Sequence, residues 1–298
     1  MDWRKAVTAV LAGIVVLGAL YLFMPRPEKP VAVEEPVRAP AIDPFARVSV
    51  QGKAAIVYDL TTGDVLYAKN PDAQLPLASL TKLITVYSAL EYLSPQYPIV
   101  VTEDALATEG DSGMILGERF SLQNAAKLAL VASSNDISEA IALTVEGVRS
   151  LSTRQLSATL AQSMGLNQTY ALNGTGLDES TTTAGGYGSA RDIAKLAGAL
   201  VEKAPEIAEA TTHTAITAAT LEGTMHTLSN TNHGIRHVPG ALLSKTGFTD
   251  LAGGNLVVVY DTGINHPVAV VVLGSTIEGR FTDVERLTNA TMLYFSSL

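Results

Sequence analysis

Hydrophobic positions recur at helical spacing between Pro76 and Leu93, in the stretch PLASLTKLITVYSALEYL. Apolar side chains three and four residues apart fall on one face of a helix, so this spacing predicts an amphipathic helix. The apolar stripe consists of Leu80, Leu83, Ile84, Tyr87 and Leu90. Ser79 and Lys82 begin the predicted helix.

The same periodicity predicts further helices in the middle and at the end of the chain. Their predicted ranges are Ser121 to Ala132, Thr153 to Met164, Ser189 to Lys203 and Thr282 to Leu298. Gly165 is typical of the position just beyond a helix end, and Pro205 stops the third helix. In the last helix, Thr282 followed three residues later by Glu285 predicts a capping box.

Alternating and β-branched segments predict strands near both ends of the chain. Residues 48–60 and 64–70 flank a Gly-containing turn and predict a hairpin, and the Thr-rich residues 211–232 predict short strands. Three more strands are predicted over Leu242 to Thr249, Asn255 to Asp261 and Val268 to Gly274. This order predicts an α/β fold: an antiparallel sheet built from both ends of the domain, flanked by helices, with a central helical subdomain.

The amino-terminal segment has a different character from the rest of the chain. Residues 6–24 carry no charge and, as a helix at about 1.5 Å per residue, reach roughly 28 Å, close to the thickness of a hydrocarbon core. A cleaved signal peptide is the alternative, but it has a shorter apolar region and a small-x-small cleavage site. We expect a cytoplasmic N-terminus over residues 1–5, a transmembrane signal-anchor over 6–24, a Pro-rich linker over 25–46 and the folded domain over 47–298.

Composition excludes several classes of function. The chain has no cysteine, which excludes disulfides and thiolate metal sites. Its net charge is −9 with a sequence pI near 5.0, which argues against nucleic acid as a partner. His226, His233 and His237 suggest a metal site, but the last two span Gly234 and precede Pro239, so no helix would present both rings on one face. We expect solvated loop histidines and no metal.

Ser79 and Lys82 form a candidate nucleophile and base. A separation of three residues places their side chains on one helical face, with Cβ atoms about 5–6 Å apart. At a helix start, free backbone N–H groups and the helix dipole favour an oxyanion. The alternative is a helix-capping serine followed by an exposed lysine. This motif alone favours the alternative, because S-x-x-K occurs by chance about once in a chain of this size.

Two further motifs change that balance. Ser133 to Asn135 supplies an S-x-N, and Lys245 to Gly247 supplies K-T-G on a predicted strand. With Ser79-x-x-Lys82 they form, in order, the set found in penicillin-binding proteins and class A β-lactamases, with S-D-N relaxed to S-x-N. From about Val48 to Leu298 the chain resembles the low-molecular-mass penicillin-binding proteins, specifically serine D-alanyl-D-alanine carboxypeptidases of the β-lactamase/transpeptidase-like superfamily. The segments 54–70, NGTGLD, SARD, NTN and Gly279-Arg280 extend the resemblance.

The resemblance implies a role for each site residue. Ser79 would be the acyl-forming nucleophile and Lys82 its base, with a pKa lowered by burial and by Lys245. Ser133 would relay a proton to the leaving amine, and Asn135 would hold the substrate amide. The amides of Ser79 and Phe248 would form the oxyanion hole. The substrate's terminal carboxylate would meet Lys245, Thr246 and Arg280, and Gly247 would let the strand approach it. Arg280 has an alternative as a surface residue paired with Asp283.

The resemblance implies a serine DD-carboxypeptidase that removes the terminal D-alanine of peptidoglycan pentapeptides through a Ser79 acyl-enzyme, without a cofactor. β-Lactams would inhibit it. The domain would lie outside a bacterial cell membrane, held by the N-terminal helix. A DD-endopeptidase that cuts cross-links is the closest alternative, followed by a β-lactamase and a silent cell-wall-binding module.

The chain departs from that family in three places. No E-x-x-x-N motif of class A β-lactamases is evident, Gly174 stands where relatives often have Pro, and the apolar anchor precedes the domain instead of following it.

Overall fold

The computed structural model describes residues 3–4, 7–8, 43–263 and 265–297. The chain divides into two units, Met1–Ile42 and Asp43–Leu298, and the fold below is that of the second. Nearly all of the predicted anchor and most of the predicted linker lie outside the described residues. Within the described ranges, no helix has the length and apolar character needed to cross a membrane.

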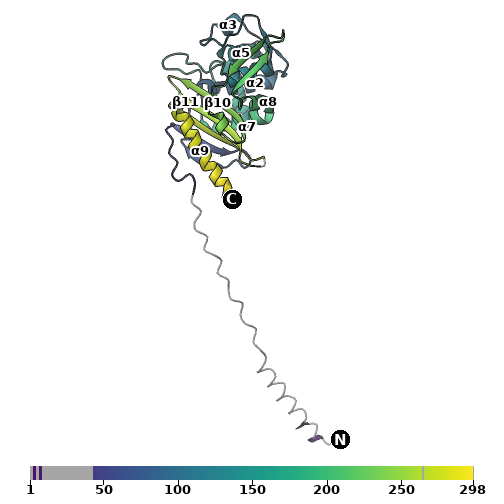
Figure 1. Cartoon of the computed structure of the whole chain (residues 1–298), viewed down its shortest axis with the longest axis vertical. Helices are drawn as coiled ribbons and strands as arrows, with labels where there is room; N and C mark the ends of the chain where they lie inside the picture. Colours follow the sequence, from purple (N-terminus) through teal and green to yellow (C-terminus); the bar gives the residue numbers. More distant parts are fainter. Residues whose placement is uncertain (1–2, 5–6, 9–42, 264, 298) are drawn as a thin grey trace. The chain divides into compact units, whose positions relative to one another are not determined.

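A five-stranded antiparallel sheet joins the two ends of the domain (Figure 1), as the sequence predicts. The strand order is β10-β11-β12-β1-β2, so β1 from the start of the domain pairs with β12 from its end, with Ala54 opposite Leu273. The bounds are β1 Ala54–Asp59, β2 Val65–Lys69, β10 Ala241–Thr249, β11 Gly253–Asp261 and β12 Pro267–Ser275. β1 and β2 form the predicted hairpin.

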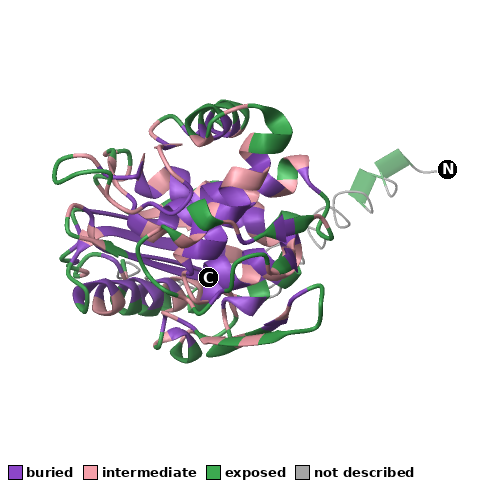
Figure 2. Cartoon of the chain, turned by 90° about the horizontal axis from the view of Figure 1, so that it is seen from above, coloured by how far each residue is buried: buried purple, intermediate pink, exposed green. Residues whose placement is uncertain are grey.

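Both faces of this sheet are covered. On one face, alternate residues of β11 (Leu256, Val258 and Tyr260) share a core with α9, which spans Gly279–Ser296. On the other face, Val257 and Val259 join the main core with the remaining helices. Because both faces of the strands are buried, their sequences are nearly continuous apolar segments. Figure 2 shows the buried strands between the helical layers.

The remaining helices lie between β2 and β10 in the chain, where the sequence predicts a helical subdomain. They are α2 Thr81–Tyr92, α3 Glu103–Leu106, α4 Leu122–Val131, α5 Asn135–Arg149, α6 Thr153–Met164, α7 Ala190–Lys203 and α8 Pro205–Ala210. Short strands and 3₁₀ turns link them: β3 Leu75–Pro76, η1 Ala78–Leu80, β4 Pro98–Val100, β5 Arg119–Ser121, β6 Tyr170–Ala171, β7 Gly186–Gly188, β8 Ala215–Ala219, β9 Met225–Ser229 and η2 Ile235–His237. Gly165 ends α6 with a φ of 65°, as predicted.

Two predicted features of α2 are wrong. Ser79 lies in η1, and the α-helix itself begins two residues later at Thr81. The helix is also buried on nearly every side, and Tyr87 and Leu90 of the predicted stripe are only partly buried. The reason is that α2 runs through the middle of the domain, so even Thr81 and Lys82 are inside.

One helix boundary also differs from prediction. α9 begins at Gly279, and no capping box forms at Thr282, because the hydroxyl of Thr276 accepts the N–H of Gly279 at 2.8 Å and starts the helix earlier. Pro205 ends α7 but is also the first residue of α8, where a missing N–H costs little.

Candidate active site

The segment carrying Ser79 is held against the sheet from two sides. The Nδ2 group of Asn255 on β11 donates to the carbonyls of Pro76 and Leu77, at 3.0 Å each. A Cβ on Gly247 of β10 would lie only 2.9 Å from the Leu77 carbonyl oxygen and 3.2 Å from the Ser79 nitrogen. Only glycine therefore lets η1 pack this closely on β10, which is a contact with the Ser79 segment that the sequence reading did not foresee.

Lys82 lies at the centre of a hydrogen-bond network. Its Nζ donates to Ser79 Oγ at 3.0 Å, to Asn135 Oδ1 at 2.7 Å and to the Thr175 carbonyl at 2.9 Å. These three bonds use the whole donor capacity of an ammonium group. Lys82 is 0% exposed, whereas Ser79 is partly exposed. The Ser79 residue is therefore accessible to solvent, and the Lys82 amine that contacts its hydroxyl is not.

Burial lowers the pKa of Lys82 to about 7, and the carboxylate of Glu139 opposes this shift. The cause is the free-energy cost of keeping a charged ammonium group away from water, which favours the uncharged amine. Near neutral pH a large share of Lys82 is therefore uncharged and able to accept a proton from Ser79.

Ser133 and Lys245 form a second hydroxyl–amine pair. Lys245 Nζ donates to Ser133 Oγ at 2.9 Å and to the Thr246 carbonyl at 2.8 Å. Ser133 has a φ of 59°, a conformation that side-chain-bearing residues seldom adopt and that recurs at functional sites. Burial lowers the pKa of Lys245 well below its usual value, and the positive charges of Lys82 and Arg280 lower it further.

Arg280 reaches the same strand from α9. Its Nη1 donates to the Gly247 carbonyl at 2.7 Å, its guanidinium lies 4.8 Å from the Phe281 ring centroid, and it is 8% exposed. Burial lowers the pKa of Arg280, and the negative charge of Glu278 raises it in part. Asp283 instead accepts from the backbone of Gln51 and Gly52. Among the ion pairs within the described ranges, none includes Lys245 or Arg280, so this Lys245–Arg280 cluster has no carboxylate partner and suits an anion.

Thr246 and Phe248 complete the predicted set. Thr246 Oγ1 donates to Thr231 Oγ1 at 2.6 Å, which fixes the hydroxyl beside the cation cluster. The Phe248 side chain is 45% exposed, at the open edge of β10. The nine predicted site residues therefore come from four places: η1 with the start of α2, the α4–α5 connection, β10 and α9.

Several residues of this site were missed from sequence. The Thr175 carbonyl accepts from Lys82, Asn173 and Glu139 hold the loop that carries Thr175, and Asn255 holds the Ser79 segment. A fully buried Asn in an otherwise apolar strand is a signal that could have identified Asn255. The bonds of Thr175 to Lys82 and of Glu139 to Gly174 join segments distant in sequence, for which no local signal exists, whereas Asn173 acts within the NGTGLD segment.

The prediction of a solvated loop histidine is wrong for His226. It lies on β9, its Nε2 is 2.8 Å from Glu118 Oε1, and its ring packs on Phe120. His233 and His237 are exposed. In the part of the chain that the structure describes, no three His, Cys, Asp or Glu side chains gather closely enough to bind a metal ion.

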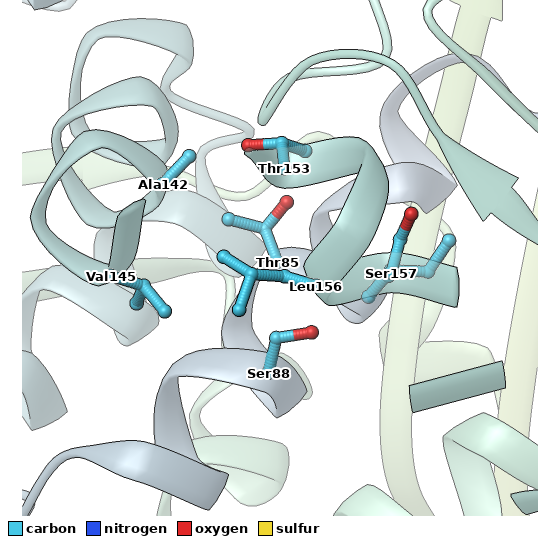
Figure 3. Close-up of a pocket in the computed structure, with 8 residues that line it drawn as sticks. Thr85, Ser88, Ala142, Val145, Thr153, Leu156 and Ser157 are labelled. Carbon is cyan, nitrogen blue, oxygen red and sulfur yellow. The ribbon is translucent and has the colours of Figure 1, made fainter. Parts of the chain in front are cut away.

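A small cavity of about 20 Å³ lies between α2, α5 and α6 (Figure 3). Ile84, Ala142, Val145 and Leu156 supply most of its wall, together with hydroxyls such as that of Ser88. The volume suits a single water molecule and is far too small for a peptide. It therefore belongs to the core and not to the catalytic site.

Comparison with known proteins places this geometry in context. Residues 39–276 match the sequence family described as D-alanyl-D-alanine carboxypeptidase. A D-alanyl-D-alanine endopeptidase of Pseudomonas aeruginosa is 32% identical over 77% of this chain and 72% of its own length. The D-alanyl-D-alanine carboxypeptidase DacC of Escherichia coli is 30% identical over 94% of this chain and 69% of its own.

Among solved structures, penicillin-binding protein D2 of Listeria monocytogenes in its ampicillin-bound form has a similar fold. The TM-score is 0.69 and the sequence identity 26%, covering 81% of this chain and 97% of that one. The similarity thus extends over nearly the whole of that protein.

Proposed function

The chain belongs to the D-alanyl-D-alanine carboxypeptidase family and is a serine-type DD-carboxypeptidase of the cell wall, and we propose that Ser79 is its nucleophile with Lys82 as base. The observation that carries this proposal is the 3.0 Å contact between Ser79 Oγ and a fully buried Lys82. Ser79 Oγ attacks the carbonyl carbon of the penultimate D-alanine while its proton passes to uncharged Lys82.

The oxyanion that forms in this step needs donors that are already in place. The backbone N–H groups of Ser79 and Phe248 are the proposed donors, because β10 packs directly on η1 at Gly247. When the tetrahedral intermediate collapses, the amide C–N bond breaks, and Ser133 relays to the leaving D-alanine amine the proton that Lys82 took from Ser79. Lys245, at 2.9 Å from Ser133 Oγ, steadies that hydroxyl. Water then hydrolyses the ester on Ser79, which restores the enzyme.

Recognition of the chain end is proposed for Lys245, Thr246 and Arg280. A carboxylate seated among them would supply the negative charge that the cluster lacks. Among the described residues, the Gly247 carbonyl is the one hydrogen-bond partner of the Arg280 guanidinium, which leaves further N–H groups for a carboxylate. Asn135, held by Lys82 and by the Glu109 carbonyl, is the proposed partner of the substrate amide.

Two substrates test the function together. Residues 43–298 are incubated with a pentapeptide ending in D-Ala-D-Ala and with a cross-linked stem-peptide dimer, and the products are identified by mass. Loss of one alanine from the pentapeptide is expected. No product from either substrate, or equal product with Ser79→Ala, would contradict the proposal.

DD-Endopeptidase activity on cross-links is a second candidate. Two relatives with that name, from Pseudomonas aeruginosa and Escherichia coli, are 32% and 30% identical, and the chain covers 72% and 86% of their lengths. Faster cleavage of the dimer than of the pentapeptide in the same experiment would favour this candidate.

Attachment to the membrane through residues 6–24 is also proposed. The uncharged apolar run supports it, because its length suits the hydrocarbon core. The domain would then act on peptidoglycan outside the membrane.

A further inference from the structure

One carboxylate next to Lys82 has no part in the reaction as described. Glu139 lies on α5, one helical turn after Asn135, so the two side chains share a face of that helix. The face meets the loop of residues 173–176. Asn135 contacts Lys82 directly, and Glu139 contacts the loop whose carbonyl binds Lys82.

The contact between Glu139 and the loop is close and specific. Glu139 Oε2 accepts the N–H of Gly174 at 3.2 Å, and the Gly174 carbonyl accepts from Ser138 Oγ at 2.7 Å and Thr85 Oγ1 at 2.8 Å. A Cβ on Gly174 would lie 2.9 Å from Glu139 Oε2 and 2.5 Å from the Ala142 Cβ. A proline at 174 would lack the N–H, so the Glu139 contact depends on Gly174 keeping its backbone donor.

The next residue of the loop, Thr175, connects the hydrogen-bonded Gly174 to Lys82, the proposed base. Thr175 follows Gly174 directly, and its carbonyl accepts one of the three hydrogen bonds of Lys82. Holding Gly174 at both its N–H and its carbonyl fixes where the Thr175 carbonyl points. The Glu139 carboxylate is therefore connected to the Lys82 ammonium through two hydrogen bonds of the loop, one at the Gly174 N–H and one at the Thr175 carbonyl.

Charge adds to this mechanical link. The Glu139 carboxylate raises the pKa of Lys82 against the effect of burial. Burial also raises the pKa of Glu139, as do Glu146 and Glu179, while the Gly174 N–H and Lys82 lower it. Lys82 on α2, Glu146 on α5 and Glu179 beyond the loop are therefore the charged groups that act on Glu139.

We propose that Glu139 is a positioning residue for Lys82, holding the 173–176 loop in place and supplying the negative charge opposite the buried ammonium. The proposal rests on the proposed function for its catalytic consequence. Its physical content is independent of turnover, because it concerns the position and charge of Lys82 in the free enzyme.

The test separates the two effects with two variants. Glu139→Gln keeps an oxygen that can accept from Gly174 but removes the charge, whereas Glu139→Ala removes both. Glu91→Gln is the matched control, because Glu91 lies on the same helix as Lys82 and forms only a partly exposed ion pair with Lys203. Thermal unfolding of each variant checks that it is folded.

The first readout is the titration of Lys82 itself. Residues 43–298 are labelled with ¹³C-lysine, and the Cε signal of Lys82 is assigned by its loss in Lys82→Ala. Removing a nearby negative charge destabilises the ammonium form, so the midpoint should fall by about one pH unit in Glu139→Gln and stay unchanged in Glu91→Gln. An unchanged midpoint in folded Glu139→Gln would overturn the proposal.

The second readout is the rate of acylation by penicillin. Glu139→Gln should approach the wild-type rate above pH 8, with its acid limb moved to lower pH, whereas Glu139→Ala should lose about tenfold or more at every pH. Equal wild-type rates in both variants would overturn the proposal. Failure of the wild-type enzyme to become acylated would refute the proposed function instead, and the titration of Lys82 would still decide the role of Glu139.

Discussion

Ser79 is the single residue on which every proposed step depends. The penicillin-binding protein of Listeria monocytogenes has been solved in ampicillin- and cefotaxime-bound forms, and its fold is similar to this one. We expect penicillin to acylate Ser79, because the lactam carbonyl mimics the scissile amide. Intact-mass spectrometry should show one adduct on the wild-type protein and none on Ser79→Ala. An adduct on that variant would place the nucleophile elsewhere.

We expect Lys82 to set the pH dependence of acylation. As the base it must be uncharged, and its pKa of about 7 means that the protonated, inactive form predominates below neutrality. The acylation rate constant should therefore fall about tenfold per pH unit below 7 and level off above it. Measuring that constant from pH 5.5 to 8.5, with thermal unfolding followed over the same range, checks this. A flat profile would remove Lys82 from the role of base.

Arg280 is expected to bind the carboxylate at the end of the substrate. Arg280→Ala should remove a charge-assisted bond of about 1.5–3 kcal/mol, a loss of roughly ten- to 150-fold in kcat/KM for the free peptide. A peptide with an amidated terminus should be hardly affected. Arg280→Lys serves as the control that keeps the charge but loses the planar fork. Equal losses on both peptides would show that Arg280 acts only through its bond to the Gly247 carbonyl.

At the scale of elements, α9 is fastened to the start of β1 by one buried carboxylate. Asp283 accepts from the N–H groups of Gln51 and Gly52 at 2.8 and 2.9 Å and from Ser275 Oγ at 2.8 Å. Asp283→Ala would leave those donors unsatisfied, so we expect a loss of about 2–4 kcal/mol in the free energy of unfolding. Denaturant unfolding measures it.

The neighbouring Glu285 supplies the matched control for that prediction. It is exposed and caps no helix in the structure, so Glu285→Ala should change the free energy of unfolding by less than about 0.5 kcal/mol. A large loss at Glu285 with none at Asp283 would mean that the helix start is secured as the sequence pattern suggested.

Elements were predictable from sequence where local chemistry decides them. α6 has the predicted bounds because Ser152 caps its start and Gly165 ends it, and the strands of the sheet follow their β-branched runs. The start of α9 was missed because Thr276, outside the predicted helix, provides the capping hydroxyl. The Ser-Lys, Ser-x-Asn and Lys-Thr-Gly motifs identified candidate residues, but the roles of Glu139 and Thr175 depend on long-range packing that no local pattern reveals.

At the scale of the whole molecule, the apolar run at the amino terminus should determine where the protein is found. The full-length chain is expected to fractionate with membranes, whereas residues 46–298 should remain soluble. Ultracentrifugation of lysates expressing each form, followed by sequencing of the mature amino terminus, checks this. An amino terminus beginning after Met24 would show that the segment is a cleaved signal peptide.

The pairing of β1 with β12 has a consequence for the timing of folding. Ala54 and Leu273 are opposite one another in the sheet, although all the helices from α2 to α8 lie between them in sequence. Ser79 is synthesised early, but Lys245 and Asn255, which complete and hold its surroundings, come late. Closing so long a loop is entropically costly and slow. A partly synthesised chain therefore carries Ser79 without the residues that complete its surroundings, and we expect peptidase activity only once the last strands are present.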